Sequence, residues 1–263
     1  MSEDILAEHC GGVAILTLNR PQSLNAWDMG MEAGLGRLIR EEAQHNETSG
    51  IVITGAGDRA FCAGQDLAEA EQFRPEQIGA WLENFRSLYE SVLGVDKPVV
   101  AALNGVAAGS GYQLALLCDI RVAHRGVRMG QPEVTSGIPS ITGMYLSERA
   151  LGTSRMLELM LTGRLMDVDE LTQVGLVHHV VPAVDVVNKA VEVAQAIGSQ
   201  PSMAIALTKE RYRQTLLPGL REAFKAAADI DRRAWSSGQP QRVMREFFES
   251  RRRGKEPVPA DPQ

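Results

Sequence analysis

Short apolar runs alternate with amphipathic segments over most of the chain. Runs rich in valine, isoleucine and leucine, ended by glycine, proline or asparagine, are typical of β-strands. They cover residues 12–18, 51–54, 98–103, 119–123, 127–130 and 177–181. Apolar residues spaced three and four positions apart predict helices over residues 27–44, 75–93 and 112–117.

The final part of the chain has a different pattern. Helical spacing dominates from about residue 142 and is nearly continuous from residue 202 to residue 250. Alternating strands and helices followed by helices alone predict an α/β fold with a helical C-terminal part.

Length and charge exclude several classes of protein. The chain has 263 residues, enough to bury a large core as one domain or as a domain with an appendage. Its 27 basic and 33 acidic residues give a net charge of −6, which disfavours non-specific binding to nucleic acid or to an anionic membrane. No segment has the length of a membrane span, and the first residues resemble no targeting sequence. We therefore expect a cytoplasmic protein without nucleic-acid or membrane partners.

Cysteine and histidine give no indication of a metal site. Cys10, Cys62 and Cys118 are too few and too scattered for a disulfide framework or a metal cluster. His178 and His179 are neighbours in a predicted strand, where successive side chains point to opposite faces. Neither a metal nor a redox cofactor is expected.

Two glycine-rich turns are candidates for chemistry. Residues 60–67 (AFCAGQDL) follow one predicted strand, and residues 104–111 (NGVAAGSG) lie between a strand and a helix. Free backbone N–H groups at a helix N-terminus can hold an anion or a developing oxyanion. The simpler interpretation is that the glycines only end secondary structure. Neither turn matches a dinucleotide fingerprint or a P-loop.

Four segments resemble the crotonase (enoyl-CoA hydratase/isomerase) superfamily in order and spacing. They are IVITGAGDRAFCAGQDL, KPVVAALNGVAAGSGYQLALLCDIRVA, MGQPEVTSGIP and LTGRLMDVDELTQVGLVHHVV, and the ending EFFESRRRGKEP is also similar. The resemblance covers about residues 10–185 and implies a spiral of β-β-α units. It also implies a core over residues 1–198, a helical oligomerisation region over residues 199–263, and a homotrimer or homohexamer.

The resemblance implies an acyl-CoA substrate and no separate cofactor, since coenzyme A is part of that substrate. The oxyanion hole for the thioester oxygen then consists of the backbone N–H groups of Gln65 and Ser110. Both belong to the turns selected above on physical grounds. The resemblance also places further residues in or directly after these turns near the substrate: Ala63, Gly64, Asp66, Leu67, Gly109 and Gln113.

Two positions decide which reaction the resemblance implies. Hydratases of the family use two glutamates; the second corresponds to Glu133, and the first corresponds to Gln113. Glutamine does not accept a proton near neutral pH. A single glutamate is the arrangement of some family isomerases, so double-bond isomerisation is favoured over hydration, with Glu133 as the general acid/base. Other members of the family have a further acidic residue eight positions after the second glutamate. This sequence has Ile141 there, so the resemblance does not support a dehalogenase or a dienoyl isomerase.

The surroundings of the substrate are less specific. Ile138, Met144 and Tyr145 suggest an apolar acyl pocket but equally fit a plain hydrophobic core. Arg251 and Arg252, in a basic run with Arg253 and Lys255, are candidates for the CoA phosphates, or are a solvated charged end. The early basic residue of the family is replaced by Gln22.

Two other functions stay open. One is another crotonase reaction, decarboxylation or thioester hydrolysis, in which Tyr112 or Tyr145 would reach the acyl group. The other is a CoA-thioester-binding protein with little catalysis. An RNA-associated role is disfavoured by the acidic net charge and by the lack of interleaved basic and aromatic segments.

Overall fold

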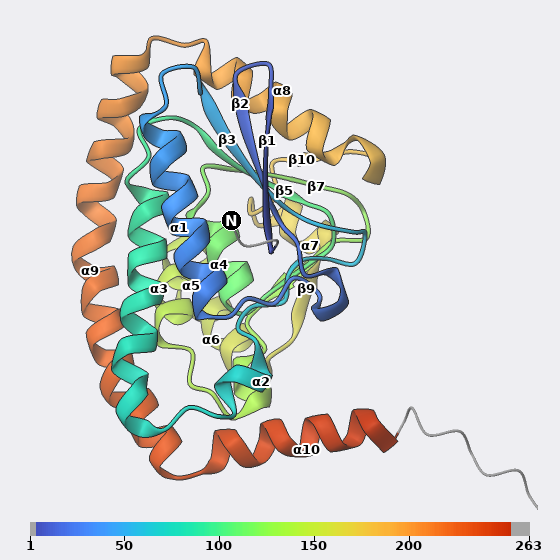
Figure 1. Cartoon of the computed structure of the whole chain (residues 1–263), viewed down its shortest axis with the longest axis vertical. Coiled ribbons are helices and arrows are strands. Elements are labelled where there is room, and N and C mark those ends of the chain that lie inside the picture. Colours follow the sequence, from blue (N-terminus) through green and yellow to red (C-terminus); the bar gives the residue numbers. More distant parts are fainter. Residues whose placement is uncertain (1–3, 254–263) are drawn as a thin grey trace, which may run out of the picture.

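The computed structural model describes the backbone of residues 4–253 and the side chains of residues 4–250. The core consists of two β-sheets with helices packed around them (Figure 1). The first sheet has six strands in the order β1-β2-β3-β5-β7-β10, and all neighbours are parallel except β1 and β2. Its strands are β1 Ile5–Cys10, β2 Val13–Leu18, β3 Gly50–Gly55, β5 Val99–Leu103, β7 Ile120–Ala123 and β10 His179–Val180.

The second sheet is smaller and follows the ends of strands of the first. Its order is β4-β6-β8-β9, with β9 antiparallel to β8. Its strands are β4 Ala60–Cys62, β6 Val106–Ala108, β8 Arg128–Gly130 and β9 Leu165–Asp167. Each of β4 and β6 therefore follows a strand of the first sheet and lies within one of the two glycine-rich segments.

Ten α-helices and four 3-10 helices (η) complete the described part of the chain. The α-helices are α1 Met29–Gln44, α2 Leu67–Ala70, α3 Ile78–Leu93, α4 Ser110–Leu117, α5 Ile141–Leu151, α6 Thr153–Thr162, α7 Val168–Gln173, α8 Val186–Gly198, α9 Ser202–Ser236 and α10 Gln239–Arg253. The 3-10 helices are η1 Pro21–Ser23, η2 Pro75–Gln77, η3 Glu133–Ser136 and η4 Ala183–Asp185.

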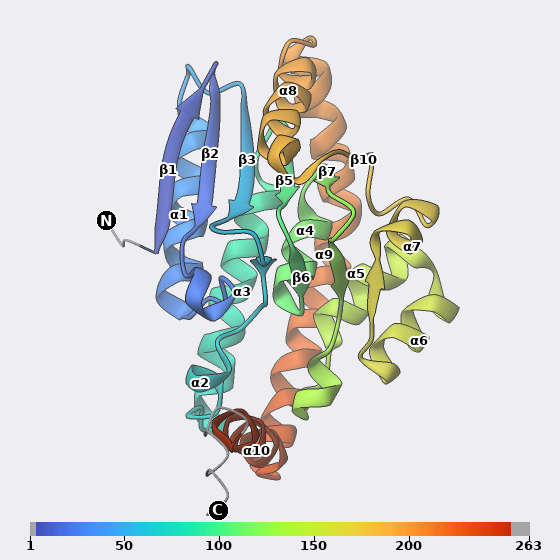
Figure 2. The same ribbon diagram turned by 90° about the vertical axis from the view of Figure 1, so that its right-hand side faces the viewer.

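The central strands are apolar because helices cover both of their faces. Val52, Val100 and Val122 point towards α8, where they form a small core with Ala190 and Ala194. Residues one position along the strands point to the opposite face and join the main core with α1, α3 and α4. Figure 2 shows α8 on one side of the first sheet and α1 and α3 on the other.

The structure confirms the α/β fold with a helical C-terminal part and most of the predicted elements. The strand β1 was missed, because five of its six residues are exposed and its sequence, ILAEHC, lacks an apolar run. The predicted strand over residues 177–181 is shorter, since only His179–Val180 pair with β7.

The C-terminal helices pack back onto the core. Helix α9 lies along α3 and α5, and α10 crosses beneath α2 and η3 (Figure 1). Two surface ion pairs lie beside this packing: Arg221 of α9 binds Glu90 of α3 at 2.9 Å, and Arg245 of α10 binds Glu71 at 3.1 Å. The division into residues 1–198 and 199–263 stays a prediction.

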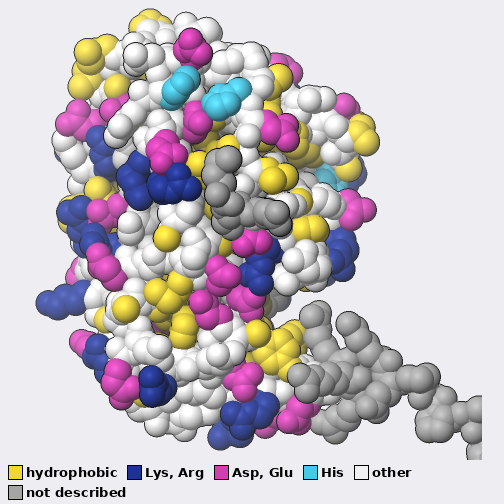
Figure 3. All heavy atoms as spheres, in the orientation of Figure 1, with side chains coloured by type: hydrophobic (Ala, Val, Ile, Leu, Met, Phe, Trp, Pro, Cys, Tyr) yellow, Lys and Arg dark blue, Asp and Glu magenta, His cyan; other side chains and the backbone are white. Residues whose placement is uncertain are grey.

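The surface has no strongly basic face in the view of Figure 3, where acidic and basic side chains are interspersed. Among the described residues, no helix combines the length and apolarity that crossing a membrane requires.

Candidate active site

One cavity lies where the two glycine-rich turns meet. Its volume is about 140 Å³. Its walls come from both turns, from α3, from the segment between residues 132 and 142, and from α9. Segments far apart in the sequence therefore form a single pocket, whose lining is mainly apolar.

The two turns approach each other so closely that glycine is required at Gly64. Its φ is +93°, a backbone conformation that residues with a side chain rarely adopt. A Cβ atom built there would lie 2.8 Å from the carbonyl oxygen of Ala108 and 3.2 Å from the backbone nitrogen of Ser110. Gly64 thus lets the 60–67 turn pack directly against the start of α4.

The predicted pair of backbone donors is free at this junction. The N–H of Ser110 begins α4, and neither it nor the N–H of Gln65 donates to an acceptor among the described residues. Trp27 pairs with the turn on either side of Gln65: its N–H donates to Gly64 and its carbonyl accepts from Asp66. Both Gln65 and Ser110 line the cavity.

Glu133 follows β8 and begins η3, directly after Pro132. Its Oε1 accepts hydrogen bonds from Gln131 Nε2 at 3.0 Å and from Gln113 Nε2 at 3.4 Å. Its Oε2 is inaccessible to solvent and has no hydrogen-bond partner among the described residues. One carboxylate oxygen is therefore fixed by two amide groups, while the other is enclosed and has no partner among the described residues.

Burial changes the acidity of Glu133. Loss of hydration disfavours the carboxylate and raises the pKa of Glu133 to about 7, although hydrogen bonds from its own backbone N–H, Gln131 and Gln113 oppose the shift. A carboxyl group with this pKa is suited to take up and return a proton near neutral pH.

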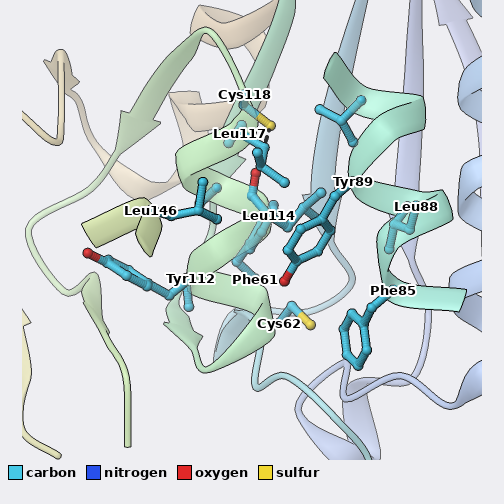
Figure 4. Packing of buried hydrophobic residues seen from close by; sticks show 14 of the residues in the cluster. Phe61, Cys62, Phe85, Leu88, Tyr89, Tyr112, Leu114, Leu117, Cys118 and Leu146 are labelled. Atoms are coloured by element: carbon cyan, nitrogen blue, oxygen red, sulfur yellow. Dashed lines mark hydrogen bonds between the residues drawn. The ribbon is translucent and has the colours of Figure 1, made fainter. Parts of the chain in front are cut away.

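Gln113 is buried and forms hydrogen bonds on both sides of its amide. Its Oε1 accepts from Tyr89 at 3.0 Å and from Thr142 at 2.8 Å, which orients Nε2 towards Glu133. Figure 4 shows Tyr89 pointing from α3 towards α4, the helix that carries Gln113. The glutamine therefore supports Glu133 and adds no titratable group.

The structure brings most of the predicted site residues together. The cavity is lined by Ala63, Gln65, Leu67, Gly109, Ser110, Gln113 and Glu133. Gly64 and Asp66 do not line it. Asp66 binds Arg20 at 2.8 Å and caps α2 through the N–H of Ala68, so its carboxylate has a structural role.

The predicted phosphate contacts are not placed. Arg251 and Arg252 belong to the last turn of α10, and their side chains, like all of Lys255, lie outside the described residues.

The alternatives for the pocket wall are partly resolved. Ile138 lines the cavity, whereas Met144 is exposed and Tyr145 does not reach it. The Tyr145 hydroxyl donates to the carbonyl of Leu216 at 3.0 Å, and Tyr112 is buried against Ser147. Neither tyrosine is available to an acyl group in this cavity.

Asp231 is a cavity residue that the sequence did not reveal. It lies on α9, about one turn after Ala227 and two turns after Phe224, which line the same wall. Its side chain is 3% exposed. The only sequence signal is an acidic residue on an otherwise apolar helix face.

The histidines form no metal site. The Nδ1 atom of His178 accepts from the backbone N–H of Arg121 at 3.1 Å, which occupies it structurally. Over residues 4–250, no group of three or more His, Cys, Asp or Glu side chains is positioned to hold a metal ion.

Parallel strands that lead into two adjacent glycine turns, beside one partly buried glutamate, are the arrangement that the resemblance to crotonases implied. The described architecture and cavity place the protein in the class of crotonase-fold enzymes, and known proteins agree with this assignment.

A sequence profile for enoyl-CoA hydratase/isomerase matches residues 8–255. The chain is 30% identical to the short-chain-enoyl-CoA hydratase of Clostridium acetobutylicum over 250 residues, which are 95% of this chain and 96% of the relative. A crystal structure of an enoyl-CoA hydratase/isomerase from Mycobacterium paratuberculosis is similar with a TM-score of 0.85 and 26% identity, over 94% of this chain and 99% of that one. The chain belongs to the enoyl-CoA hydratase/isomerase family.

Proposed function

We propose that the protein moves the double bond of an enoyl-CoA from between C3 and C4 to between C2 and C3, with Glu133 as the proton carrier. The observation that supports this most directly is the pairing of Glu133 with Gln113. The amide holds one carboxylate oxygen of this cavity residue, and the other oxygen has no partner among the described residues. Among the described residues, Glu133 is the one glutamate that lines the cavity, and the nearby Glu69 is bound to the side chain of Gln65.

In the proposed reaction, the thioester carbonyl accepts hydrogen bonds from the N–H groups of Gln65 and Ser110. Glu133 Oε2 removes a proton from C2 of the 3-enoyl-CoA, and the electron pair moves onto the thioester oxygen. The two fixed N–H donors stabilise that negative charge; one such donor typically contributes about 3–4 kcal/mol to lowering the barrier. Glu133 then returns the proton to C4 as the double bond forms between C2 and C3, so that protons and electrons balance.

The direct test is to incubate the purified protein with 3-enoyl-CoA and, separately, with 2-enoyl-CoA. Formation of 2-enoyl-CoA from the first substrate, without net addition of water, is expected. Formation of 3-hydroxyacyl-CoA from the second would instead support hydration, the second candidate, which the names of the relatives favour. Turnover of neither substrate would contradict both.

The pKa of Glu133 predicts how activity depends on pH. The base must be ionised to remove a proton, and its pKa is about 7. The value of kcat/KM for 3-enoyl-CoA is therefore expected to fall about tenfold per pH unit below pH 7 and to level off above it. Initial rates measured from about pH 5.5 to pH 8.5 check this. A flat profile with turnover intact would show that another group is the base.

A further inference from the structure

Asp231 combines deep burial with an unsatisfied hydrogen-bonding capacity. It lines the cavity, its side chain is 3% exposed, and its Oδ1 has no hydrogen-bond partner among the described residues. Buried polar groups are normally paired, so an unpaired one in a cavity wall indicates that a ligand completes it. The reaction proposed above makes no use of this carboxyl group.

Among the side chains that the structure describes, no cation forms an ion pair with Asp231. Lysine and arginine are absent from the described residues that line the cavity, whose other titratable groups are Glu133 and Tyr89. The nearby Arg232 pairs with the exposed Asp229 at 3.1 Å. Burial, with repulsion from Glu133, raises the pKa of Asp231 to about 8. Near neutral pH, Asp231 is therefore mostly a neutral carboxylic acid that both donates and accepts hydrogen bonds.

The wall around Asp231 is apolar and firmly packed. Trp81, Phe85 and Phe224 line it, and the ring of Trp81 lies 5.4 Å from that of Phe85 and 5.6 Å from that of Trp235. A single polar group in such a wall fixes the orientation of a ligand and discriminates against ligands that leave it unpaired.

The size of the cavity limits what can occupy it. Its volume of about 140 Å³ is close to the roughly 150 Å³ of an engineered apolar cavity that holds one benzene molecule. Short acyl groups of about six carbon atoms or fewer are therefore the first ligands to test.

We propose that Asp231 determines substrate specificity by binding a hydrogen-bond-donating group, a hydroxyl or an ammonium, on a short acyl chain. This inference rests on the proposed function, because it places the acyl part of an acyl-CoA in this cavity. Plain alkyl chains of equal length leave the carboxyl group buried and unpaired, and they bind less tightly for that reason.

Binding measurements test this separately from turnover. The protein is titrated calorimetrically at pH 7 with saturated CoA thioesters whose acyl chains have about four to six carbons. At each chain length, the ligands differ only in the terminal group, which is a hydroxyl, an amino or a methyl group. The hydroxyl or amino ligand is expected to bind about 10- to 100-fold more tightly than its methyl partner at one chain length. A preference for the amino ligand alone would identify the bound group as a cation, and a preference for the hydroxyl ligand would identify it as neutral.

Variants on α9 assign the effect to the carboxyl group. Asp231→Leu, which has the same number of side-chain heavy atoms and no polarity, is expected to abolish the preference and to bind the methyl ligand at least as tightly as the wild type does. Asp231→Asn keeps hydrogen bonding and should retain a preference of at least a few-fold. Asp229→Asn, an exposed neighbour on the same helix, should leave all affinities unchanged. Thermal unfolding confirms that each variant is folded.

Two results would overturn the assignment. One is equal affinity of the wild type for methyl and hydroxyl ligands at every chain length. The other is an Asp231→Leu variant that keeps the preference but loses turnover on every enoyl-CoA, which would make the residue a proton donor. If no thioester binds at all, the proposed function itself fails.

Discussion

Replacing Glu133 with glutamine is expected to lower kcat on 3-enoyl-CoA by about 10²- to 10⁴-fold, the usual contribution of a positioned acid or base. Glutamine has nearly the same shape and retains hydrogen bonding to Gln131 and Gln113, but it cannot carry a proton. KM should change little, because the glutamine side chain occupies the same space as that of Glu133 and leaves the shape of the acyl pocket unchanged. Steady-state kinetics at pH 8, where most of the wild-type carboxyl is ionised, measures the effect.

The same variant should not be destabilised above pH 7. The folded pKa of Glu133 is about 7, above its ordinary value of 4.5, so the folded state binds more protons than the unfolded state between these values. Stability contributed by this group is therefore lost as pH rises through that window. Glutamine escapes this loss, and the free energy of unfolding of Glu133→Gln should equal or exceed that of the wild type at pH 8. An inactive but stable variant is the expected result.

Gln113→Ala is the matched comparison for Glu133. It removes the hydrogen bond that reaches Glu133 over 3.4 Å, and it leaves the hydroxyls of Tyr89 and Thr142 without their acceptor. Activity should fall far less than in Glu133→Gln, while stability falls by about 1–3 kcal/mol. Equal losses of kcat in the two variants would contradict a mechanism with Glu133 as its proton carrier.

Gly64→Ala is expected to lower kcat by about 10²- to 10³-fold, the effect of losing one oxyanion-hole donor. The added Cβ atom would lie 2.8 Å from the Ala108 carbonyl oxygen, so the two turns must separate. Separation moves the N–H groups of Gln65 and Ser110 apart, and both cannot then hold the same oxygen. Single-turnover kinetics on 3-enoyl-CoA isolates the chemical step.

Gly175→Ala serves as the control for backbone strain. Gly175 has a φ of +77°, so alanine is disfavoured there too, but nothing lies within 4 Å of the added Cβ atom. Both variants should lose some stability, roughly 1 kcal/mol from the strained backbone. Only Gly64→Ala should lose activity. A similar loss of kcat in Gly175→Ala would mean that strain, and not separation of the donors, causes the effect.

The sequence by itself determined the parts of the site that lie within continuous segments. Each glycine-rich turn follows a run of strand residues. Glycine is favoured at Gly64 and Gly109 because the backbone has a positive φ at both positions. Glu133 and Gln113 were identified because they belong to motifs of the family. The apolar strand over residues 98–103 was readable because its burial on both faces makes it apolar throughout.

Only the tertiary structure decided what closes the cavity and how acidic its carboxyl groups are. Asp231 lies almost 100 residues beyond Glu133 in the sequence, and it reaches the same cavity because α9 packs back along α3 and α5. Exposed β1 was missed for a related reason: its residues pair with β2 through the backbone and leave no apolar pattern. Burial and the approach of distant charges arise from long-range packing, which the identity of a residue and its neighbours in sequence do not specify.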